Sequence, residues 1–304
     1  MGDKREITGW AMYDWANSAF STTVVTAFLG PYLAALIVTR PGSILPIGPY
    51  RIEPDAFYPF CVTISVILQV IFLPLLGALA DFTNWKKRLL IAFATIGGVA
   101  TVGLGWVSNG EQVVAGGLLF ILANFSFGAA VVFYNAYLPD IAPPEQQDSI
   151  SSKGFAYGYV GGGLLLALNM VLFQVVAETA VAVRLSLASA GVWWLLFTWL
   201  YPKRRLVERK TAVVPAHLSQ FFTHSARQFI QTLREMVRHH PRTLQFLVAY
   251  LIYNDGIMTV NTVAAIFAAS ELGMGPEQLV GVILMIQFVA ALGAIICNKI
   301  AGCI

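Results

Sequence analysis

The stretch that decides the fold occupies residues 57–80 and reads FYPFCVTISVILQVIFLPLLGALA, without a single charged side chain. A helix that crosses a lipid bilayer needs about 20 consecutive, predominantly apolar residues, and this stretch has that length. Its apolar residues run continuously instead of alternating with polar ones, which favours a membrane helix over a strand of a membrane barrel. Residues 57–80 therefore predict a transmembrane helix.

Seven other stretches have a similar length and apolar character, and charged or turn-forming residues bound each of them. They occupy residues 10–37, 89–107, 113–138, 154–177, 185–201, 244–269 and 279–298. The first is too long for a signal peptide, contains Asp14 and lacks a small-residue cleavage site, so we expect it to remain in the mature protein. The sequence thus predicts an all-α, polytopic bundle of eight transmembrane helices.

The composition of the whole chain excludes an ordinary soluble enzyme. Of its 304 residues, 57% are hydrophobic and only 12% are charged, and the mean hydropathy is +0.70, whereas soluble proteins carry roughly a quarter charged residues. The three cysteines and four histidines show no metal-ligand spacing, and the chain has no phosphate-binding loop of the kind that ATP-driven pumps use. We therefore expect no enzymatic activity, no cofactor and no metal site.

Lysine and arginine are distributed very unequally between the two sets of loops. All of the 19 basic residues except Arg40, Arg51 and Arg184 fall in the segments on one side of the predicted membrane. Because loops rich in lysine and arginine stay in the cytoplasm, we expect both termini there, as an even number of spans requires.

The longest connection between spans, residues 202–242, separates six predicted spans from two. We therefore divide the chain into an N-terminal six-helix half at residues 1–201, a basic cytoplasmic linker at residues 202–242, and the first two helices of a second half at residues 243–304. Apolar linker residues recur every three or four positions, with arginines among them; they are Leu218, Phe221, Phe222, Phe229, Leu233, Met236 and Val237, with Arg227, Arg234 and Arg238. This pattern predicts an amphipathic helix along the inner leaflet or against the bundle. We favour it over nucleic-acid binding, because basic residues beside a span usually meet lipid.

Two carboxylates fall inside predicted spans, where acidic side chains are costly and usually functional. Asp14 lies in the first span and Asp255 in the seventh. Each is followed by two hydroxyl side chains at the spacing i, i+4, i+7, which places all three on one helix face. Ser18 and Ser21 follow Asp14, and Thr259 and Thr262 follow Asp255, with Asn17 and Asn261 widening the two stripes. Since such a face is unfavourable in lipid, we predict that both stripes line a cavity or a protein interior and bind a substrate or a proton.

Two interpretations of these acids remain open. In the first, the stripes mark an internal repeat, in which spans one and seven open equivalent halves of a transporter with the solute site between them. In the second, each aspartate caps a helix or pairs locally near a membrane face, Asp14 with a lysine at headgroup level. A carboxylate buried away from water holds its proton more tightly, so the first interpretation makes proton coupling feasible.

Gly154, Gly158 and Gly162 repeat at four-residue spacing in the fifth span. Small residues at this spacing let the backbones of two membrane helices approach closely. We expect a helix-packing surface here. A smooth contact between two moving halves is an alternative that the sequence does not rank.

Between the second and third spans, residues 77–88 read GALADFTNWKKR. This stretch resembles the signature loop of the major facilitator superfamily, in which Gly-x-x-x-Asp precedes a basic cluster, and Gly77, Asp81, Lys86, Lys87 and Arg88 match it. A plain cytoplasmic turn would account for the basic cluster but not for Gly77 and Asp81. We expect Asp81 to meet a helix N-terminus or an arginine, and the basic cluster to hold the loop inside.

Three further stretches resemble the vacuole effluxer-like subfamily of autophagy-related permeases and its bacterial relatives. They are GWAMYDWANSAF at residues 9–20, NAYLPDIA at residues 135–142 together with GFAYGYVGGG at residues 154–163, and YNDG at residues 253–256. The resemblance covers nearly the whole chain and implies a twelve-helix transporter with two six-helix halves and alternating access. Some eukaryotic relatives are linked to amino-acid efflux. Only eight of the twelve expected spans are present, so we expect a C-terminally truncated chain.

The predicted function is secondary-active transport of a small polar solute, with amino acids as a candidate class, by rocking of two halves around a midplane cavity. The alternative is a truncated, non-transporting membrane protein, either a remnant or a module that binds a partner. We expect an integral protein of a bacterial inner membrane whose partners are the solute and the lipid bilayer, with no nucleic acid and with coupling to protons. The oligomeric state is not predicted.

Overall fold

The computed structural model describes residues 3–82, 84–209, 231 and 234–301. Within them, eight helical segments are long and apolar enough to cross a membrane. They are Lys4–Val38, Pro54–Gly77, Lys86–Leu104, Gly110–Ile141, Pro144–Val175, Thr179–Arg205, Pro241–Ser270 and Pro276–Gly293. Each contains one of the eight predicted stretches or most of it, so the predicted all-α transmembrane bundle is confirmed.

The first span consists of three consecutive helical elements. These are the α-helix α1 (Lys4–Ala19), the π-helix η1 (Phe20–Phe28) and the α-helix α2 (Leu29–Val38). The side chain of Asp3 caps α1 by accepting a hydrogen bond from the backbone N–H of Arg5, at 2.9 Å. A π-helix has more residues per turn than an α-helix, so side chains after Phe20 point in directions that regular helical spacing does not predict.

Five long helices complete the first six spans and the start of the linker. They are α3 (Pro54–Phe82), α4 (Lys86–Leu104), α5 (Val113–Ile141), α6 (Pro144–Val175) and α7 (Thr179–Leu200), followed by the short α8 (Pro202–Arg205). Two helices of the second half follow, α10 (Pro241–Ser270) and α11 (Pro276–Ala301). Proline opens α3, α6, α8, α10 and α11, where its missing N–H is not needed and its fixed φ suits the first helical turn.

A short β-hairpin, not predicted from the sequence, connects the first and second spans. After the 3₁₀ turn η2 (Pro41–Ser43), strand β1 (Leu45–Ile47) pairs antiparallel with β2 (Tyr50–Ile52), and Ile47 lies opposite Tyr50. Gly48, the first loop residue, has a φ of 57°, which suits a two-residue hairpin turn. A second 3₁₀ turn, η3 (Gly110–Gln112), precedes α5.

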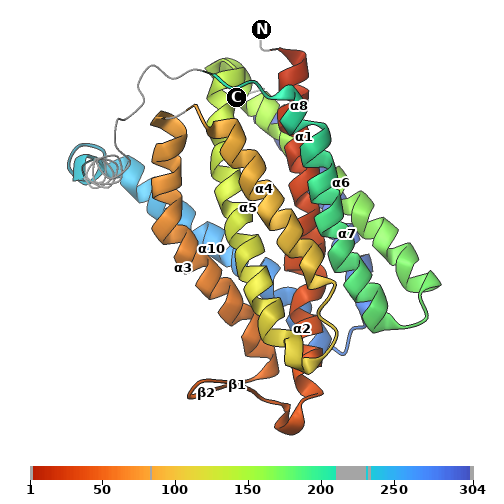
Figure 1. Ribbon diagram of the computed structural model, residues 1–304. Helices are drawn as coiled ribbons and strands as arrows, with labels where there is room; N and C mark the ends of the chain where they lie inside the picture. The colour runs from red at the N-terminus through yellow and green to blue at the C-terminus, as the bar shows by residue number, and fades with distance from the viewer. Residues whose placement is uncertain (1–2, 83, 210–230, 232–233, 302–304) are drawn as a thin grey trace.

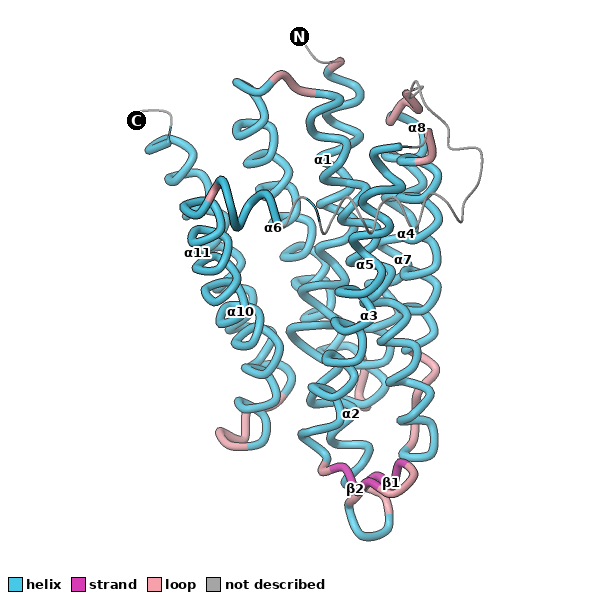
Figure 2. The backbone as a smooth tube through the Cα atoms, turned by 90° about the vertical axis from the view of Figure 1, so that its left-hand side faces the viewer, coloured by secondary structure: helices cyan, strands magenta, loops and turns pink. Residues whose placement is uncertain are grey.

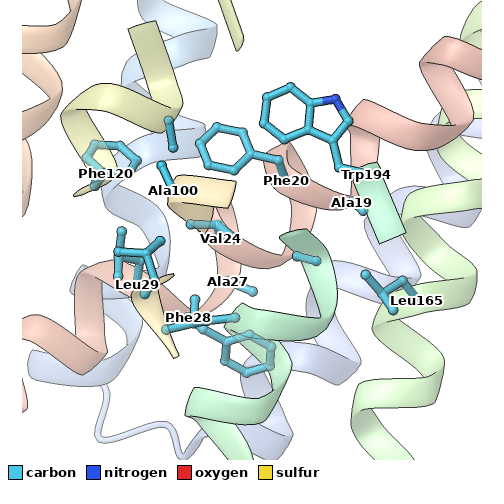
Figure 3. Close-up of a cluster of buried hydrophobic side chains, with 14 of the residues drawn as sticks. Ala19, Phe20, Val24, Ala27, Phe28, Leu29, Ala100, Phe120, Leu165 and Trp194 are labelled. Carbon is cyan, nitrogen blue, oxygen red and sulfur yellow. The ribbon is translucent and has the colours of Figure 1, made fainter. Parts of the chain in front are cut away.

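The first span lies at the centre of the six-helix half (Figure 1), where α1 packs against α6, α7 and α5. Around it, α4 packs against α5 and α7, and α3 packs against α5. Large apolar side chains fill the middle of this half: Phe20 is fully buried, and its ring lies 5.4 Å from that of Trp194 between centroids (Figure 3). The core therefore holds α1 and η1 from several sides, and the polar residues of the first span are placed within it.

The two ends of the bundle differ in what they carry. The start of α1 and the end of α11 lie at one end, and the β-hairpin lies at the other (Figure 2); we call these the terminal end and the hairpin end. Arg40, Arg51 and Arg184 belong to the hairpin end, and the basic residues of α8 and of the start of α4 to the terminal end. The predicted separation of basic residues is thus present in the fold, while the cytoplasmic placement of the termini stays a prediction.

Helices α10 and α11 join the six-helix half mainly at the hairpin end. The buried residues of α10 are Ala265 and Ile266, near its C-terminus, and Ile266 packs against Gly30 of α2. On α11, buried residues occur near the start, at Val280 and Ile283, and this helix packs against α6. Toward the terminal end, the side chains of α10 are largely exposed.

The predicted amphipathic helix of the linker lies largely outside the described residues. Leu218, Phe221, Phe222, Arg227, Phe229 and Leu233 belong to that part of the chain. Residues 234–239 are helical, and Val237 is exposed. The division at residues 201 and 242 remains a prediction, with α10 beginning at Pro241.

Candidate functional site

Asp14 is held in place by aromatic residues from α1 and α5. The Tyr134 hydroxyl donates a hydrogen bond to Asp14 Oδ2 at 2.9 Å. Trp10 lies one turn before Asp14, stacks on the Tyr134 ring with centroids 4.2 Å apart, and donates from its indole N–H to the Tyr134 carbonyl oxygen at 2.9 Å. Trp10 thus fixes Tyr134, and Tyr134 orients the carboxylate.

The predicted glycines of α6 face this carboxylate and its neighbours on α1. A Cβ atom on Gly154 would lie 2.7 Å from the Tyr134 hydroxyl oxygen and 2.9 Å from Asp14 Oδ2. A Cβ atom on Gly158 would lie 2.6 Å from Ser18 Oγ, and one on Gly162 would lie 3.1 Å from the Ser18 carbonyl oxygen. All four distances are shorter than an ordinary van der Waals contact, so α6 approaches α1 this closely only because these positions carry no side chain.

The polar stripe of the first span differs from the predicted one in its third member. Asp14 and Ser18 face α6, but Ser21 is exposed, whereas Thr22 is buried, faces Gly162 and donates its hydroxyl proton to the Ser18 carbonyl oxygen. The prediction of Ser21 assumed a regular α-helix. It was wrong because a π-helix begins at Phe20 and turns the side chains that follow in other directions. Asn17 is buried at 4% exposure. The four-residue spacing of the glycines, matched to Asp14, Ser18 and Thr22, is the signal that would have identified Thr22.

No basic side chain pairs with Asp14 among the described residues. The three ion pairs there are Lys86–Asp140, Arg88–Glu208 and Arg209–Glu6, so the predicted pairing of Asp14 with a lysine does not occur in this part of the chain. Asp14 lies ten residues beyond Lys4, about 15 Å along the helix axis, well inside the span Lys4–Val38. In the described chain, no group of three or more His, Cys, Asp and Glu side chains is arranged to hold a metal ion.

Asp255 lies in a different environment from Asp14. It lies midway along α10, about 21–23 Å from either end, and its side chain is exposed. Thr259 is also exposed, Thr262 is partly buried, and no described contact joins this stripe to Asp14. The structure therefore does not bring the two predicted stripes together.

The signature loop lies at the terminal end, between α3 and α4. Gly77 and Asp81 fall in the last turns of α3, and the Asp81 side chain is outside the described part of the structure. Lys86 Nζ lies 2.9 Å from Asp140 Oδ2 and donates a second hydrogen bond to the Ala136 carbonyl oxygen at 3.2 Å. Lys86 thereby ties the start of α4 to the end of α5; Lys87 is partly buried.

A second polar cluster at the terminal end was not predicted from the sequence. Glu6, 3% exposed, accepts hydrogen bonds from both terminal nitrogens of Arg209, at 2.8 and 2.7 Å, and from the Val207 N–H at 3.1 Å. These hydrogen bonds are the main reason that the pKa of Arg209 is raised. Next to it, Arg88 pairs with Glu208 at 2.9 Å. The start of the linker is thus fastened to α1 and α4.

Comparison with known proteins identifies the family of the chain. The family model described as "Vacuole effluxer Atg22 like" matches residues 2–302. The chain belongs to this family. The Atg22-like family thus agrees with the resemblance seen in the sequence motifs.

Relatives of the Atg22-like chain come from bacteria and fungi. It is 27% identical over 303 residues to the uncharacterized MFS-type transporter YxiO of Bacillus subtilis, covering 98% of this chain and 68% of the relative. It is 24% identical over 395 residues to autophagy-related protein 22-1 of Penicillium rubens, covering 96% and 67%, and 25% identical over 338 residues to autophagy-related protein 22 of Yarrowia lipolytica, covering 87% and 57%. The chain therefore spans roughly two thirds of the length of the Bacillus and Penicillium relatives, and a smaller part of the Yarrowia relative.

These relationships confirm the predicted class. The Atg22-like chain is an integral membrane protein of a transporter family of the major facilitator type, not a member of an enzyme family. Such a family handles small-molecule solutes in a membrane, as predicted.

Proposed function

We propose that the chain is a secondary-active transporter that moves a small polar solute by alternating access, and that Asp14 couples this movement to a proton. The observation that carries the proposal is the environment of Asp14: a carboxylate inside a membrane span, with a hydrogen bond from Tyr134 and no basic partner among the described residues. An ionised carboxylate there is costly unless a cation pairs with it, and protonation removes the charge altogether. A group that gains and loses a proton at this place can link proton movement to the helix contact between α1 and α6.

Amino acids are the solute class that we propose first. The motif resemblance links some eukaryotic relatives to amino-acid efflux, and the family name describes vacuole effluxers. The ammonium group of an amino acid is also a suitable partner for an unpaired carboxylate, because charge-assisted hydrogen bonds are stronger than neutral ones. A solute and a proton would then compete for the same group, which is one physical basis for coupled exchange.

Asp255 remains the predicted second group of the site. Its exposed carboxylate at mid-depth cannot face lipid at low cost, so this face of α10 needs either an aqueous hollow or further protein against it. The junction of α10 and α11 with the six-helix half near the hairpin end supports a hollow on the terminal side of that junction. The unequal distribution of basic residues supports cytoplasmic termini in a bacterial inner membrane.

The test uses the full chain reconstituted in lipid vesicles with an imposed pH gradient, measuring uptake of labelled amino acids and internal pH together. We expect Asp14→Asn to remove the dependence of uptake on the pH gradient and Tyr134→Phe to weaken it. Asp55→Asn is the matched control, because Asp55 is an exposed carboxylate in the first turn of α3. Unchanged flux and pH dependence in Asp14→Asn would remove this residue from the mechanism, and the same result in Asp255→Asn would remove the second group.

A partner-binding membrane protein without transport activity is the second candidate function. The exposure of Asp255 and Thr259 on α10 favours it, since a partner helix would cover this polar face. In this case the reconstituted chain shows no solute flux, and it purifies as a complex whose formation is weakened by Asp255→Asn.

A further inference from the structure

An apolar cavity of about 450 Å³ lies near the hairpin end, away from Asp14. Its walls come from the end of the first span, the start of α7, and the end of α10 and start of α11 with the loop between them; they include Phe28, Tyr32, Ala35, Val183, Met274 and Leu279. Figure 3 shows Ala27 and Phe28, which form part of one wall, among the buried core side chains. The cavity thus lies where the six-helix half meets the two helices of the second half.

The walls of the cavity have little capacity for hydrogen bonding. The Tyr32 hydroxyl donates to the Val107 carbonyl oxygen at 2.6 Å, and the Thr39 hydroxyl donates to the Leu36 carbonyl oxygen at 2.7 Å. A polar solute would lose its water here without gaining equivalent partners, which costs free energy. An apolar occupant gains free energy with each group that it removes from water, so the cavity suits an apolar ligand.

The position of the cavity in the spans indicates which apolar ligand is available. The first span ends at Val38, α7 begins at Thr179 and α11 begins at Pro276, so all three walls lie near one face of the membrane. Ala35 and Ala180, on different walls, are exposed, which leaves the cavity accessible from outside. At this depth the surrounding apolar molecules are the acyl chains of phospholipids.

The chain next to the cavity carries charges of both signs. Arg40 follows Thr39, and Glu178 precedes Thr179. Arg40 donates a hydrogen bond from Nη1 to the Gly110 carbonyl oxygen at 2.6 Å, and within the described residues its other guanidinium nitrogens have no partner. Arginine binds phosphate well through such free donors, so a phospholipid phosphate can lie here while its tail enters the cavity.

We propose that this cavity binds one acyl chain of a membrane phospholipid, with the headgroup beside Arg40. Its volume is within the range of small-molecule sites. An acyl chain in this place contacts both the six-helix half and the α10–α11 loop, so its binding stabilises their contact at the hairpin end. The site shares no residue with the stripe around Asp14, and the proposal is independent of the proposed transport activity.

The experiment uses the full chain in vesicles of phosphatidylethanolamine and phosphatidylglycerol that contain a trace of phosphatidylethanolamine with a photoactivatable group near the end of one acyl chain. After irradiation and digestion, mass spectrometry locates the labelled residues. We expect more label in residues 27–39, 179–183 and 274–279 than at Val70 and Val175, which are 69% and 77% exposed and lie outside the cavity walls. Equal labelling of the cavity walls and these two valines would overturn the proposal.

Variants that fill the cavity test occupancy directly. Ala35→Trp and Ala180→Trp fill it from two different walls. Val38→Trp is the control, because Val38 lies on the same helix as Ala35, is 55% exposed and does not line the cavity. Displacing even two methylene groups of the acyl chain lowers occupancy about tenfold, so we expect about a tenfold loss of label in the walls for either cavity variant and none for the control. Label that persists in the folded cavity variants, or that an amino acid displaces, would refute phospholipid binding.

Discussion

An alanine at position 161 is expected to destabilise the contact between α1 and α6 on which the geometry of Asp14 depends. Its Cβ atom would lie 2.6 Å from the Trp15 carbonyl oxygen and 2.9 Å from Cγ of the Trp15 ring. Trp15 is itself held, because Trp193 donates from its indole N–H to the same carbonyl oxygen at 3.2 Å, and their rings stack with centroids 5.8 Å apart. Relief of the clash therefore requires the two helices to separate by about 0.8 Å at this point.

The magnitude follows from a comparison with alanine at position 163 on the same helix. A Cβ atom on Gly163 would meet only Cβ of Gln287, at an ordinary contact distance of 3.8 Å. Both substitutions gain the same helix propensity of up to about 1 kcal/mol, so the difference between them is the cost of overpacking, typically about 1–3 kcal/mol. A difference of about 2 kcal/mol corresponds to roughly 4–8 °C in Tm.

The assay is thermal unfolding of the purified full chain in detergent, with Gly161→Ala, Gly163→Ala and the unmodified protein measured side by side. We expect Gly161→Ala to melt several degrees below Gly163→Ala, which melts at or slightly above the unmodified protein. If the two alanine variants melt at the same temperature, or in the opposite order, the close approach of α6 to α1 at Trp15 is wrong.

Two further predictions concern the terminal end and the Asp14 site. Among the described residues, Arg209→Ala leaves the buried Glu6 carboxylate with only the Val207 N–H as a partner, and it is expected to destabilise the protein by about 1–3 kcal/mol. Arg88→Ala removes a pair whose arginine side chain is 70% exposed, and it costs at most about 1 kcal/mol. Equal Tm values for these two variants would contradict the assigned role of Glu6. Gly154→Ala places a methyl group beside this hydrogen bond, 2.7 Å from the Tyr134 hydroxyl oxygen and 2.9 Å from Asp14 Oδ2, so both oxygens must shift. We expect pH-dependent uptake to fall to the level of Tyr134→Phe, and unaltered uptake in a folded variant would show that the hydrogen bond is not needed.

Much of the architecture could be predicted from the sequence, because a chain that crosses a lipid bilayer needs helices of a minimum length and apolar character. Residues 57–80 and the other apolar stretches had the length that a bilayer requires, and continuous apolarity excluded barrel strands. The separation of Arg40, Arg51 and Arg184 from the basic residues of α8 and of the start of α4 likewise corresponded to the two ends of the bundle. These properties depend on composition along the chain and not on distant contacts.

The candidate site could be predicted from the sequence only in part. Asp14, Ser18 and the spacing of Gly154, Gly158 and Gly162 were visible in the sequence, because acids and small residues are conspicuous in an apolar span. The contact of these two sets with each other was not visible, since Tyr134 reaches Asp14 from a residue 120 positions away. Ser21 was misplaced for a local reason, because a π-helix changes the direction of side chains without a clear mark in the residue types.

The sequence by itself determined that the chain lies in a membrane as helices, which stretch of the chain each helix occupies, and that Asp14 and Asp255 are too costly to face lipid, although α6 begins ten residues before the predicted stretch. Tertiary structure alone decided the surroundings of the polar groups. Asp14 lies against Tyr134 and Gly154, Glu6 binds Arg209, and the Asp255 side chain is exposed. The physical reason is that the free energy of transfer from water to lipid is a sum over a local stretch of residues. A hydrogen bond or a close helix contact, in contrast, depends on atoms that only packing brings within about 3 Å of each other.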